Sequence, residues 1–258
     1  MGISSPGFSG LTYKDIEMKL QALLLTVATT GVMFSSPSNA LKAPGFLTAQ
    51  SSPDSLAILP PPPAEDSVAF LADKARYESG RVLRNDDRVR LASEDADYKN
   101  FGEAFSAAYG MDISEKHTPV LYQLLAQVLQ DSHDYAMRSA KEHYKRVRPF
   151  VIYKDATCTP QKDKKMATTG SYPSGHASFG WAVALVLSEI NPQRETEILR
   201  RGYDFGESRV VCGAHWQSDV DAGRLMGAAV VAALHSNPGF TRMLDEARAE
   251  SEKLNGRK

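Results

Sequence analysis

The amino-acid sequence predicts an all-α protein with a single compact helical domain, and three observations carry this prediction. Apolar residues recur at helical spacing through most of the chain from Ala64 onward. No segment shows sustained alternation of apolar and polar residues between turn signals, the pattern of half-buried strands. No internal repeat is visible, and 258 residues suffice for one sizeable core but are marginal for two.

Two helices are predicted in the first part of the domain. Residues 67–83 place apolar side chains between charged ones at helical spacing. Residues 98–109 form a second helical segment with an aromatic face, and Gly110 closes it.

A long helix is predicted to begin at Thr118-Pro119, where a capping residue precedes a proline suited to the first turn. Apolar residues then follow one stripe, and the helical run continues to Val147. We expect Pro149 to end this helix near Arg148, because the residue before a proline disfavours the α region.

Two apolar helices follow. Residues 177–190 are apolar nearly all round, so we expect this helix to be central. Residues 220–235 are rich in Ala, Gly and Val, and Gly223 and Gly227 would let another helix approach closely.

The N-terminal segment has the pattern of a secretory signal peptide. Met18 and Lys19 precede an apolar run over residues 20–34, and small residues ending at Ala40 form a cleavage site. The alternative is an uncleaved membrane anchor, but the run of about 15 residues is shorter than the roughly 20 needed to span a bilayer. No later segment is apolar enough to cross a membrane. We therefore predict export to the periplasm.

The sequence pattern divides the chain into four predicted parts. They are an upstream extension (1–17), a signal peptide (18–40), a Pro-rich lead-in laid over the surface (41–63) and the main helical domain (64–258). The net charge of −1 gives no reason to expect a nucleic acid or an anionic membrane as a partner.

The two cysteines, Cys158 and Cys212, lie in the exported part of the chain. An even number of cysteines in an exported protein favours a disulfide. Two buried free thiols are the alternative, and the wide spacing does not suggest a zinc site.

Three short stretches carry the predicted chemistry, and the first is Lys141-x6-Arg148-Pro149. Seven residues are nearly two helical turns, so we expect Lys141 and Arg148 on one face of the long helix, about 10 Å apart along its axis. A lysine and a planar arginine fork suit two sides of one phosphate. The alternative is a solvated basic stretch, since Lys145 and Arg146 lie nearby.

The second stretch, Pro173-Ser174-Gly175-His176, leads into the central helix. Ser174 is suited to cap that helix, and Gly175 lets the backbone approach a ligand. The free N–H groups and the positive end of the helix dipole would face an anion, with His176 beside it. An ordinary serine cap with a surface histidine is the alternative.

The third stretch is Ser208-Arg209-x5-His215-x3-Asp219. His215 and Asp219 are four residues apart, so one helical turn brings the carboxylate within reach of an imidazole nitrogen. That contact would fix the tautomer and leave the other nitrogen as a nucleophile. Arg209 supplies a second guanidinium. A satisfied histidine–aspartate pair on the surface is the alternative.

The order and spacing of these stretches resemble the acid phosphatase superfamily, which also includes lipid phosphatases and vanadium haloperoxidases. The flanking residues, 170–176 and 212–221, resemble the bacterial class A non-specific acid phosphatases, as do residues 59–63 and 189–192. The resemblance runs from about Leu56 to the end of the chain. It implies a central helical bundle of the acid phosphatase/haloperoxidase type, and self-association into a homo-oligomer.

The resemblance implies a role for each residue of the three stretches. His215 would be the nucleophile, Asp219 the carboxylate that orients it, and His176 the general acid and base. The groups expected to bind the substrate phosphate are Lys141, Arg148, Ser174, Gly175 and Arg209. These cations would do the work of a metal pair, so neither a metal nor a cofactor is expected.

The expected activity is that of an acid phosphatase acting on many phosphate monoesters through a phosphohistidine. We expect an acidic pH optimum, with the pKa values of His176 and His215 pushed apart. Residues on the leaving-group side are expected from the segments 97–115 and 157–169.

Two residues depart from the family pattern. Ala177 stands where the family usually has Thr, and Ala214 where it usually has Tyr. Four alternatives remain open: a vanadate-dependent haloperoxidase-like oxidase, a nucleotide di- or triphosphate hydrolase, a phosphotransferase to alcohols, and a non-catalytic phosphate-binding module.

Overall fold

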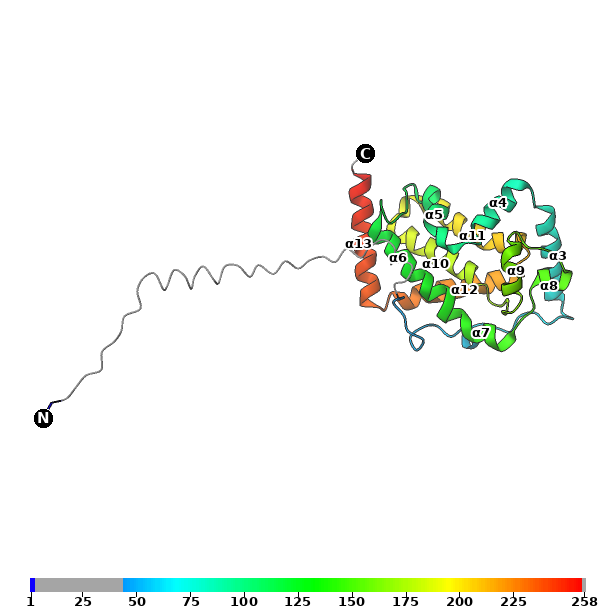
Figure 1. Ribbon diagram of the computed structural model, residues 1–258, viewed down its shortest axis with the longest axis horizontal. Coiled ribbons are helices and arrows are strands. Elements are labelled where there is room, and N and C mark those ends of the chain that lie inside the picture. The colour runs from blue at the N-terminus through cyan, green and yellow to red at the C-terminus, as the bar shows by residue number, and fades with distance from the viewer. Residues whose placement is uncertain (3–43, 257–258) are drawn as a thin grey trace. The chain divides into compact units, whose positions relative to one another are not determined.

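The computed structural model describes residues 1–2 and 44–256 of the chain. The predicted signal peptide (18–40) and nearly all of the upstream extension (1–17) lie outside the described residues. Residues 44–256 belong to one packed unit, and every regular element in this part of the chain is a helix (Figure 1). The predicted all-α fold is therefore confirmed.

Most elements are α-helices; η2 and η4 are 3₁₀-helical, and η3 is a π-helical turn. In chain order they are α2 (Ser55–Ile58), α3 (Val68–Val82), α4 (Asp86–Glu94), η2 (Tyr98–Asn100), α5 (Phe101–Tyr109), α6 (Pro119–Gln130), η3 (Asp131–Tyr135), α7 (Ala136–Tyr144), α8 (Pro149–Tyr153), α9 (Pro160–Met166), α10 (Gly175–Ile190), η4 (Pro192–Arg194), α11 (Glu195–Val211), α12 (Gln217–Leu234) and α13 (Pro238–Asn255). None of the helices in the described residues is long and apolar enough to cross a membrane.

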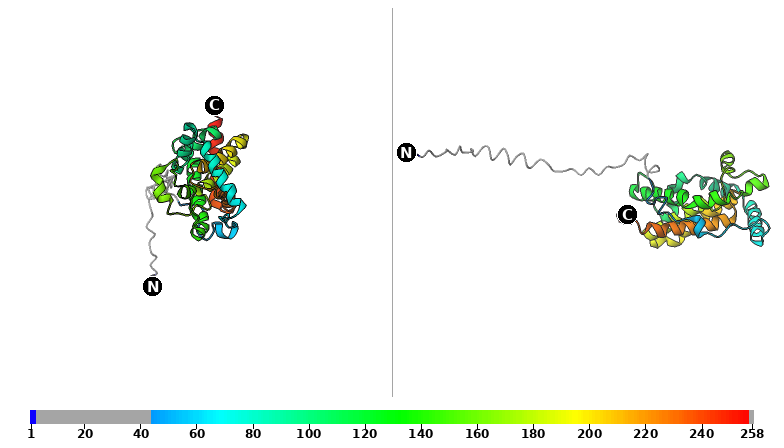
Figure 2. Two further views of the ribbon diagram at one scale, coloured as in Figure 1. Left: turned by 90° about the vertical axis from the view of Figure 1, so that its right-hand side faces the viewer. Right: turned by 90° about the horizontal axis from the view of Figure 1, so that it is seen from below.

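Helix α10 is central, as its sequence predicts, and it packs against both α11 and α12. Its inward side chains, such as Val183 and Leu187, are fully buried. Within residues 44–256, α13 lies at one end of the packed helices and α3, α8 and α9 lie at the other (Figure 1 and Figure 2).

Two glycines allow α12 to approach α10 closely. A Cβ atom at Gly223 would lie 2.4 Å from the carbonyl oxygen of Ser174, and one at Gly227 would lie 2.4 Å from that of Ser178. Both distances are far below van der Waals contact, so no larger residue fits without a backbone shift. The predicted close approach is confirmed, and it places the starts of these two helices side by side.

The predicted continuous helix from Thr118 to Val147 is wrong only at its C-terminal end. The helical path runs through α6, η3 and α7, but it ends at Tyr144. Lys145 takes a left-handed conformation with φ of 45°, and its N–H donates to the carbonyl of Lys141, which closes the helix. The chain therefore leaves the helix three residues earlier than Val147.

Arg148 consequently does not lie on the same helix as Lys141, and the predicted shared face is wrong. Arg148 is extended, with φ −77° and ψ 150°, as expected for a residue before proline. Pro149 begins the short helix α8 instead of ending the long one. The two cations approach each other through a shared tertiary contact and not through helical periodicity, because both donate to the carbonyl of Gly170, over 3.1 and 3.3 Å.

The lead-in packs against the helices that follow it. The N–H groups of Phe46 and Leu47 donate to the carboxylate of Asp131 over 2.9 and 3.0 Å. Further along, the Tyr172 hydroxyl donates to the carbonyl of Pro60 over 2.8 Å. Burial raises the pKa of Asp131 to about 6.

We predict that Gly227→Ala destabilises the protein. Overpacking against the Ser178 carbonyl costs about 1–3 kcal/mol, which exceeds the roughly 1 kcal/mol gained in helix propensity. Urea unfolding should show a lower midpoint with an unchanged slope. Gly256→Ala is the control, because its Cβ would meet ordinary contact at 3.4 Å. An unchanged midpoint for Gly227→Ala would contradict the packing described above.

Candidate active site

The three predicted stretches meet at the N-terminal ends of α10 and α12. Ser174 caps α10, and its Oγ accepts a hydrogen bond from the N–H of Ala177 over 3.3 Å. The N–H of Ser174 donates to the carbonyl of Asp219 over 2.8 Å. The second and third stretches are therefore joined directly through the backbone.

Arg148 joins the first stretch to the other parts. Its side chain is buried, and Nε donates to the carbonyls of Met166 and Thr169 over 2.9 and 3.2 Å. Nη1 donates to the carbonyl of Ala214 and lies 3.0 Å from Nε2 of His215. Burial lowers the pKa of Arg148 to about 10, which leaves it charged at neutral pH.

The contact with Arg148 assigns the tautomer of His215. A guanidinium has donors only, so Nε2 of His215 must be the acceptor and the proton must lie on Nδ1. That Nδ1 lies 3.5 Å from Oδ2 of Asp219, an ion-pair distance longer than a well-formed hydrogen bond. Burial first, and then Arg148, Lys141 and Arg209, hold the pKa of His215 well below its usual value. The ring is therefore neutral, with the Nε2 lone pair on the side of the cations.

Of the remaining cations, Arg209 is buried and Lys141 is partly buried, and each has few hydrogen-bond partners. Arg209 is 1% exposed, and its Nε and Nη1 have no hydrogen-bond partner. Lys141 donates to the carbonyl of Gly170 over 3.1 Å. Burial and the charge of Arg148 lower the pKa of Lys141 to about 7. Unpaired buried donors on cations are costly, and an anion between them would satisfy them.

His176 lies in the first turn of α10, as predicted. Its Nε2 is 3.3 Å from the carbonyl of Ala96, and its ring packs edge-on against Tyr98 and His133. Burial is the main cause that lowers its pKa, followed by Arg209. The protein's own groups therefore lower the pKa values of both catalytic histidine candidates, and the predicted separation requires a further charge, such as a bound phosphate.

The structure adds residues that the sequence did not single out. Arg146 donates to Oδ1 of Asp219 over 2.6 Å and also pairs with Asp73 of α3. In the sequence, Arg146 belongs only to a basic stretch, and Asp73 lies far upstream without a motif around it. The helical pattern of residues 67–83 predicts that α3 is a helix. No motif spacing in the sequence connects Asp73 with the active-site residues.

The predicted disulfide between Cys158 and Cys212 is present, so the alternative of two free thiols is wrong. It joins the segment before α9 to the end of α11. Ala177 and Ala214 are both fully buried in small apolar clusters, so their methyl groups are packed within the protein.

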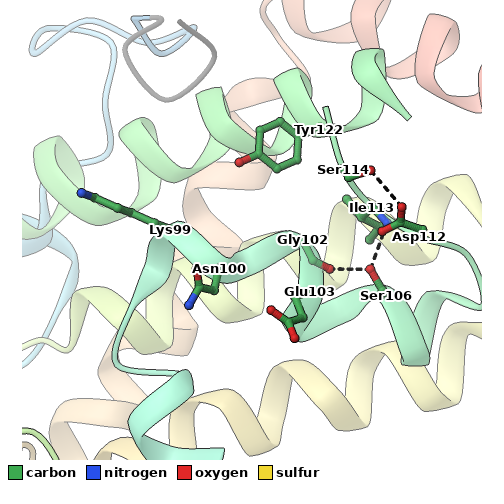
Figure 3. A pocket seen from close by; sticks show the side chains of 9 residues that line it. All are labelled: Lys99, Asn100, Gly102, Glu103, Ser106, Asp112, Ile113, Ser114 and Tyr122. Atoms are coloured by element: carbon green, nitrogen blue, oxygen red, sulfur yellow. Dashed lines mark hydrogen bonds between the residues drawn. The ribbon is translucent and has the colours of Figure 1, made fainter. Parts of the chain in front are cut away.

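A pocket of about 410 Å³ lies outside the cation cluster, between α5 and α6 (Figure 3). The residues that line it are Lys99, Asn100, Gly102, Glu103, Ser106, Asp112, Ile113, Ser114 and Tyr122. All but Tyr122 fall in the segment 97–115, which was expected to supply leaving-group residues, but none belongs to the three stretches. Among the described residues, no group of three or more His, Cys, Asp or Glu side chains could hold a metal ion.

Comparison with known proteins identifies the family of the chain. Residues 119–242 match the family described as the PAP2 superfamily. A non-specific acid phosphatase of Providencia stuartii is 48% identical over 243 residues, which cover 90% of this chain and 98% of that protein. One from Salmonella typhimurium is 44% identical over 207 residues, with 80% and 83% covered. An acid phosphatase of Zymomonas mobilis is 37% identical over 238 residues, with 90% of each chain covered.

The all-α fold and these relatives show that the chain belongs to the PAP2 superfamily. Within it, the chain is a class A non-specific acid phosphatase, and it is an enzyme.

The partly buried Lys141 predicts a pH dependence of anion binding. With a pKa of about 7, Lys141 is charged below pH 7 and neutral above it. Sulfate keeps its charge over this range, so its affinity should fall as the pH rises through 7, by at most about tenfold per unit. Calorimetric titration at several pH values measures this. Lys141→Met should remove the step, whereas Lys116→Met, at an exposed site, should keep it. An unchanged profile in Lys141→Met would show that another group titrates.

The disulfide is expected to stabilise the fold substantially. A chain-entropy argument for a separation of 54 residues gives about 4 kcal/mol. The double variant Cys158→Ser/Cys212→Ser should therefore unfold at a clearly lower denaturant concentration. Adding a reductant should lower the stability of the parent protein and leave the double variant unchanged. Equal stability of parent and variant would refute the estimate.

Proposed function

We propose that this acid phosphatase hydrolyses many phosphate monoesters through a phosphohistidine on His215. The single observation that carries the proposal is the contact of Arg148 with Nε2 of His215. It supports a neutral nucleophile whose lone pair lies on the side of the buried cations, where a phosphate would bind. The unpaired donors of Arg209 add to this support.

In the proposed first step, Lys141, Arg148 and Arg209 hold the phosphate oxygens, together with the Ser174 hydroxyl and the Gly175 amide. The positive end of the α10 dipole adds to their charge. Nε2 of His215 attacks phosphorus in line, an N–P bond forms, and the ester P–O bond breaks. His176 in its protonated form donates its proton to the leaving alkoxide.

In the second step, His176 takes a proton from water, and the water oxygen attacks phosphorus. The N–P bond breaks, inorganic phosphate leaves, and the Nε2 lone pair of His215 is restored. Positive side chains provide the charge stabilisation in both steps, so we propose that turnover needs no metal ion.

The proposed pH dependence follows from the lowered pKa values. His176 and Lys141 both act in their charged forms, and burial lowers the pKa of each. Their charged fractions therefore rise as the pH falls, and a bound phosphate raises both pKa values again. Activity should be highest at acidic pH and should decline as the pH rises above about 7.

The proposed substrates are small phosphorylated molecules, because the cation cluster is suited to the phosphate and not to the leaving group. A minor transfer of phosphate to alcohols is part of the proposal, and nucleic acid is not an expected partner. We also propose export to the periplasm, with cleavage after Ala40 and residues 64–258 as the catalytic domain, and assembly into a homo-oligomer. The disulfide supports export, because such bonds persist in oxidising compartments.

Two histidine variants test the mechanism. His215→Ala should lose at least about 10³-fold in turnover and should form no phosphoenzyme. His176→Ala should lose about 10²–10⁴-fold, yet it should still become phosphorylated by a substrate with a good leaving group, such as p-nitrophenyl phosphate. An alkaline quench preserves phosphohistidine for detection. His117→Ala, at an exposed position, is the control and should behave like the parent. Substantial turnover by His215→Ala would rule the scheme out.

A substrate panel discriminates among the alternatives. The mature protein would be assayed across about pH 4–8 with a chelator, using monoesters, nucleotide di- and triphosphates, and monoesters plus an alcohol acceptor. Release of phosphate from monoesters at acidic pH is the expected result. Bromide oxidation after addition of vanadate, without phosphate release, would favour an oxidase.

A further inference from the structure

A closed network of hydrogen bonds lies behind His215, on the side away from the cations. Arg146 donates from Nη1 to Oδ1 of Asp219 over 2.6 Å and from Nη2 to Oδ2 of Asp73 over 2.7 Å. Ser218 bridges the other side: its N–H donates to Oδ1 of Asp73 over 2.9 Å, and its Oγ donates to Oδ2 of Asp73 over 2.6 Å. The network ties α3, the segment between α7 and α8, and the first turn of α12.

The network is shielded from water. The side chains of Arg146, Asp73 and Asp219 are 8%, 3% and 0% exposed. The Arg146 guanidinium carbon also lies 5.6 Å from the ring centres of both Phe70 and Trp216. Charges held in this way are weakly screened, so each acts strongly on its neighbours.

The net charge of Arg146, Asp73 and Asp219 determines how this network acts on His215. Arg146 paired with Asp219 alone would form a neutral pair, and little negative charge would remain to act on the imidazole of His215. Arg146 is shared with a second carboxylate, Asp73, so the three groups together carry a net charge of −1. Oδ2 of Asp219, held by the N–H of Trp216 over 2.8 Å, is the oxygen that remains near Nδ1 of His215.

This negative charge is matched to the proposed intermediate. When Nε2 bonds to phosphorus while Nδ1 keeps its proton, the imidazole ring becomes positively charged. Arg148, Lys141 and Arg209 all oppose a positive charge on His215. A net negative network on the Nδ1 side offsets that repulsion.

We propose that Arg146 and Asp73 are positioning residues for the phosphatase reaction: Arg146 orients Asp219 toward His215, and Asp73 balances Arg146 so that Asp219 still stabilises the phosphorylated ring. The inference rests on the proposed role of His215. Neither residue touches the substrate phosphate; both act through Asp219.

The test compares variants that alter the network with one that breaks a similar ion pair elsewhere. Asp73→Asn keeps the shape but removes the counter-charge. Arg146→Lys keeps the charge but loses the fork, which donates to Asp219, to Asp73 and, over 2.8 Å, to the Oγ of Ser218. Glu207→Gln is the control, since Glu207 is a buried carboxylate shared by Arg76 and Arg224. For each variant, three quantities are measured: the phosphorylation rate in a single turnover with alkaline quench, the inhibition constant of inorganic phosphate, and the urea midpoint.

Asp73→Asn should slow phosphorylation by about 10- to 100-fold, by analogy with the loss of a hydrogen-bond partner that orients a metal-binding histidine. Its inhibition constant for phosphate should stay within about twofold, because the cations are unchanged. Arg146→Lys should lose less than Arg146→Gln. Glu207→Gln should lower the urea midpoint without slowing phosphorylation.

Three outcomes would overturn the inference: an unchanged phosphorylation rate in Asp73→Asn and Arg146→Lys, an equal slowing in Glu207→Gln, or a parallel weakening of phosphate inhibition that indicates a disrupted cation cluster. If Asp73→Asn does not fold, Arg146→Lys decides the matter alone. Absence of phosphohistidine in the parent enzyme would instead refute the proposed function, so the two failures are distinguishable.

Discussion

The buried guanidinium of Arg148 is the interaction on which the rest of the site depends. It joins the loop at Met166 and Thr169 to the turn at Ala214 and His215, segments that are far apart in the sequence. Because a guanidinium is planar and only donates, these bonds set both the position of the loop and the tautomer of His215. Lys141 reinforces the arrangement by donating to Gly170 in the same loop.

A concentration of buried positive charge follows from this arrangement, and the surrounding structure must hold it in place. Arg148 lowers the pKa values of Lys141 and Arg209 in addition to the effect of burial. The glycine contacts between α10 and α12 and the disulfide at Cys212 are independent of this charge, so they can hold the cations near one another despite repulsion. A dianion would relieve the repulsion and satisfy the open donors of Arg209, so we expect the site to favour phosphate over neutral ligands.

Local signals predicted the fold well, and the residues that they singled out for the site lie near one another in the structure. Serine caps at Ser67 and Ser174 start α3 and α10 as their chemistry requires, and the all-apolar segment that follows Ser174 became the central helix. The shared helical face of Lys141 and Arg148 failed, because Lys145 adopts a left-handed backbone that lysine does not signal. The sequence could not identify Asp73 as a residue near the active site. Its ion pair with Arg146 depends on how α3 packs, and periodicity in a single sequence carries no information about such long-range contacts.

The charges around His215 form an ordered arrangement across the imidazole ring. Cations lie on the Nε2 side, where Arg148 donates to the lone pair, and the carboxylate of Asp219 lies on the Nδ1 side. A field in this direction keeps the free ring neutral and its Nε2 lone pair on the side of the cations. The same field opposes the positive ring that forms after attack, unless negative charge remains on the Nδ1 side. A carboxylate fully neutralised by one arginine could not provide it, whereas two carboxylates sharing Arg146 can. The position of Asp73 on α3, remote from the motifs, is consistent with this role. From there its carboxylate sets the net charge of the network without entering the phosphate site.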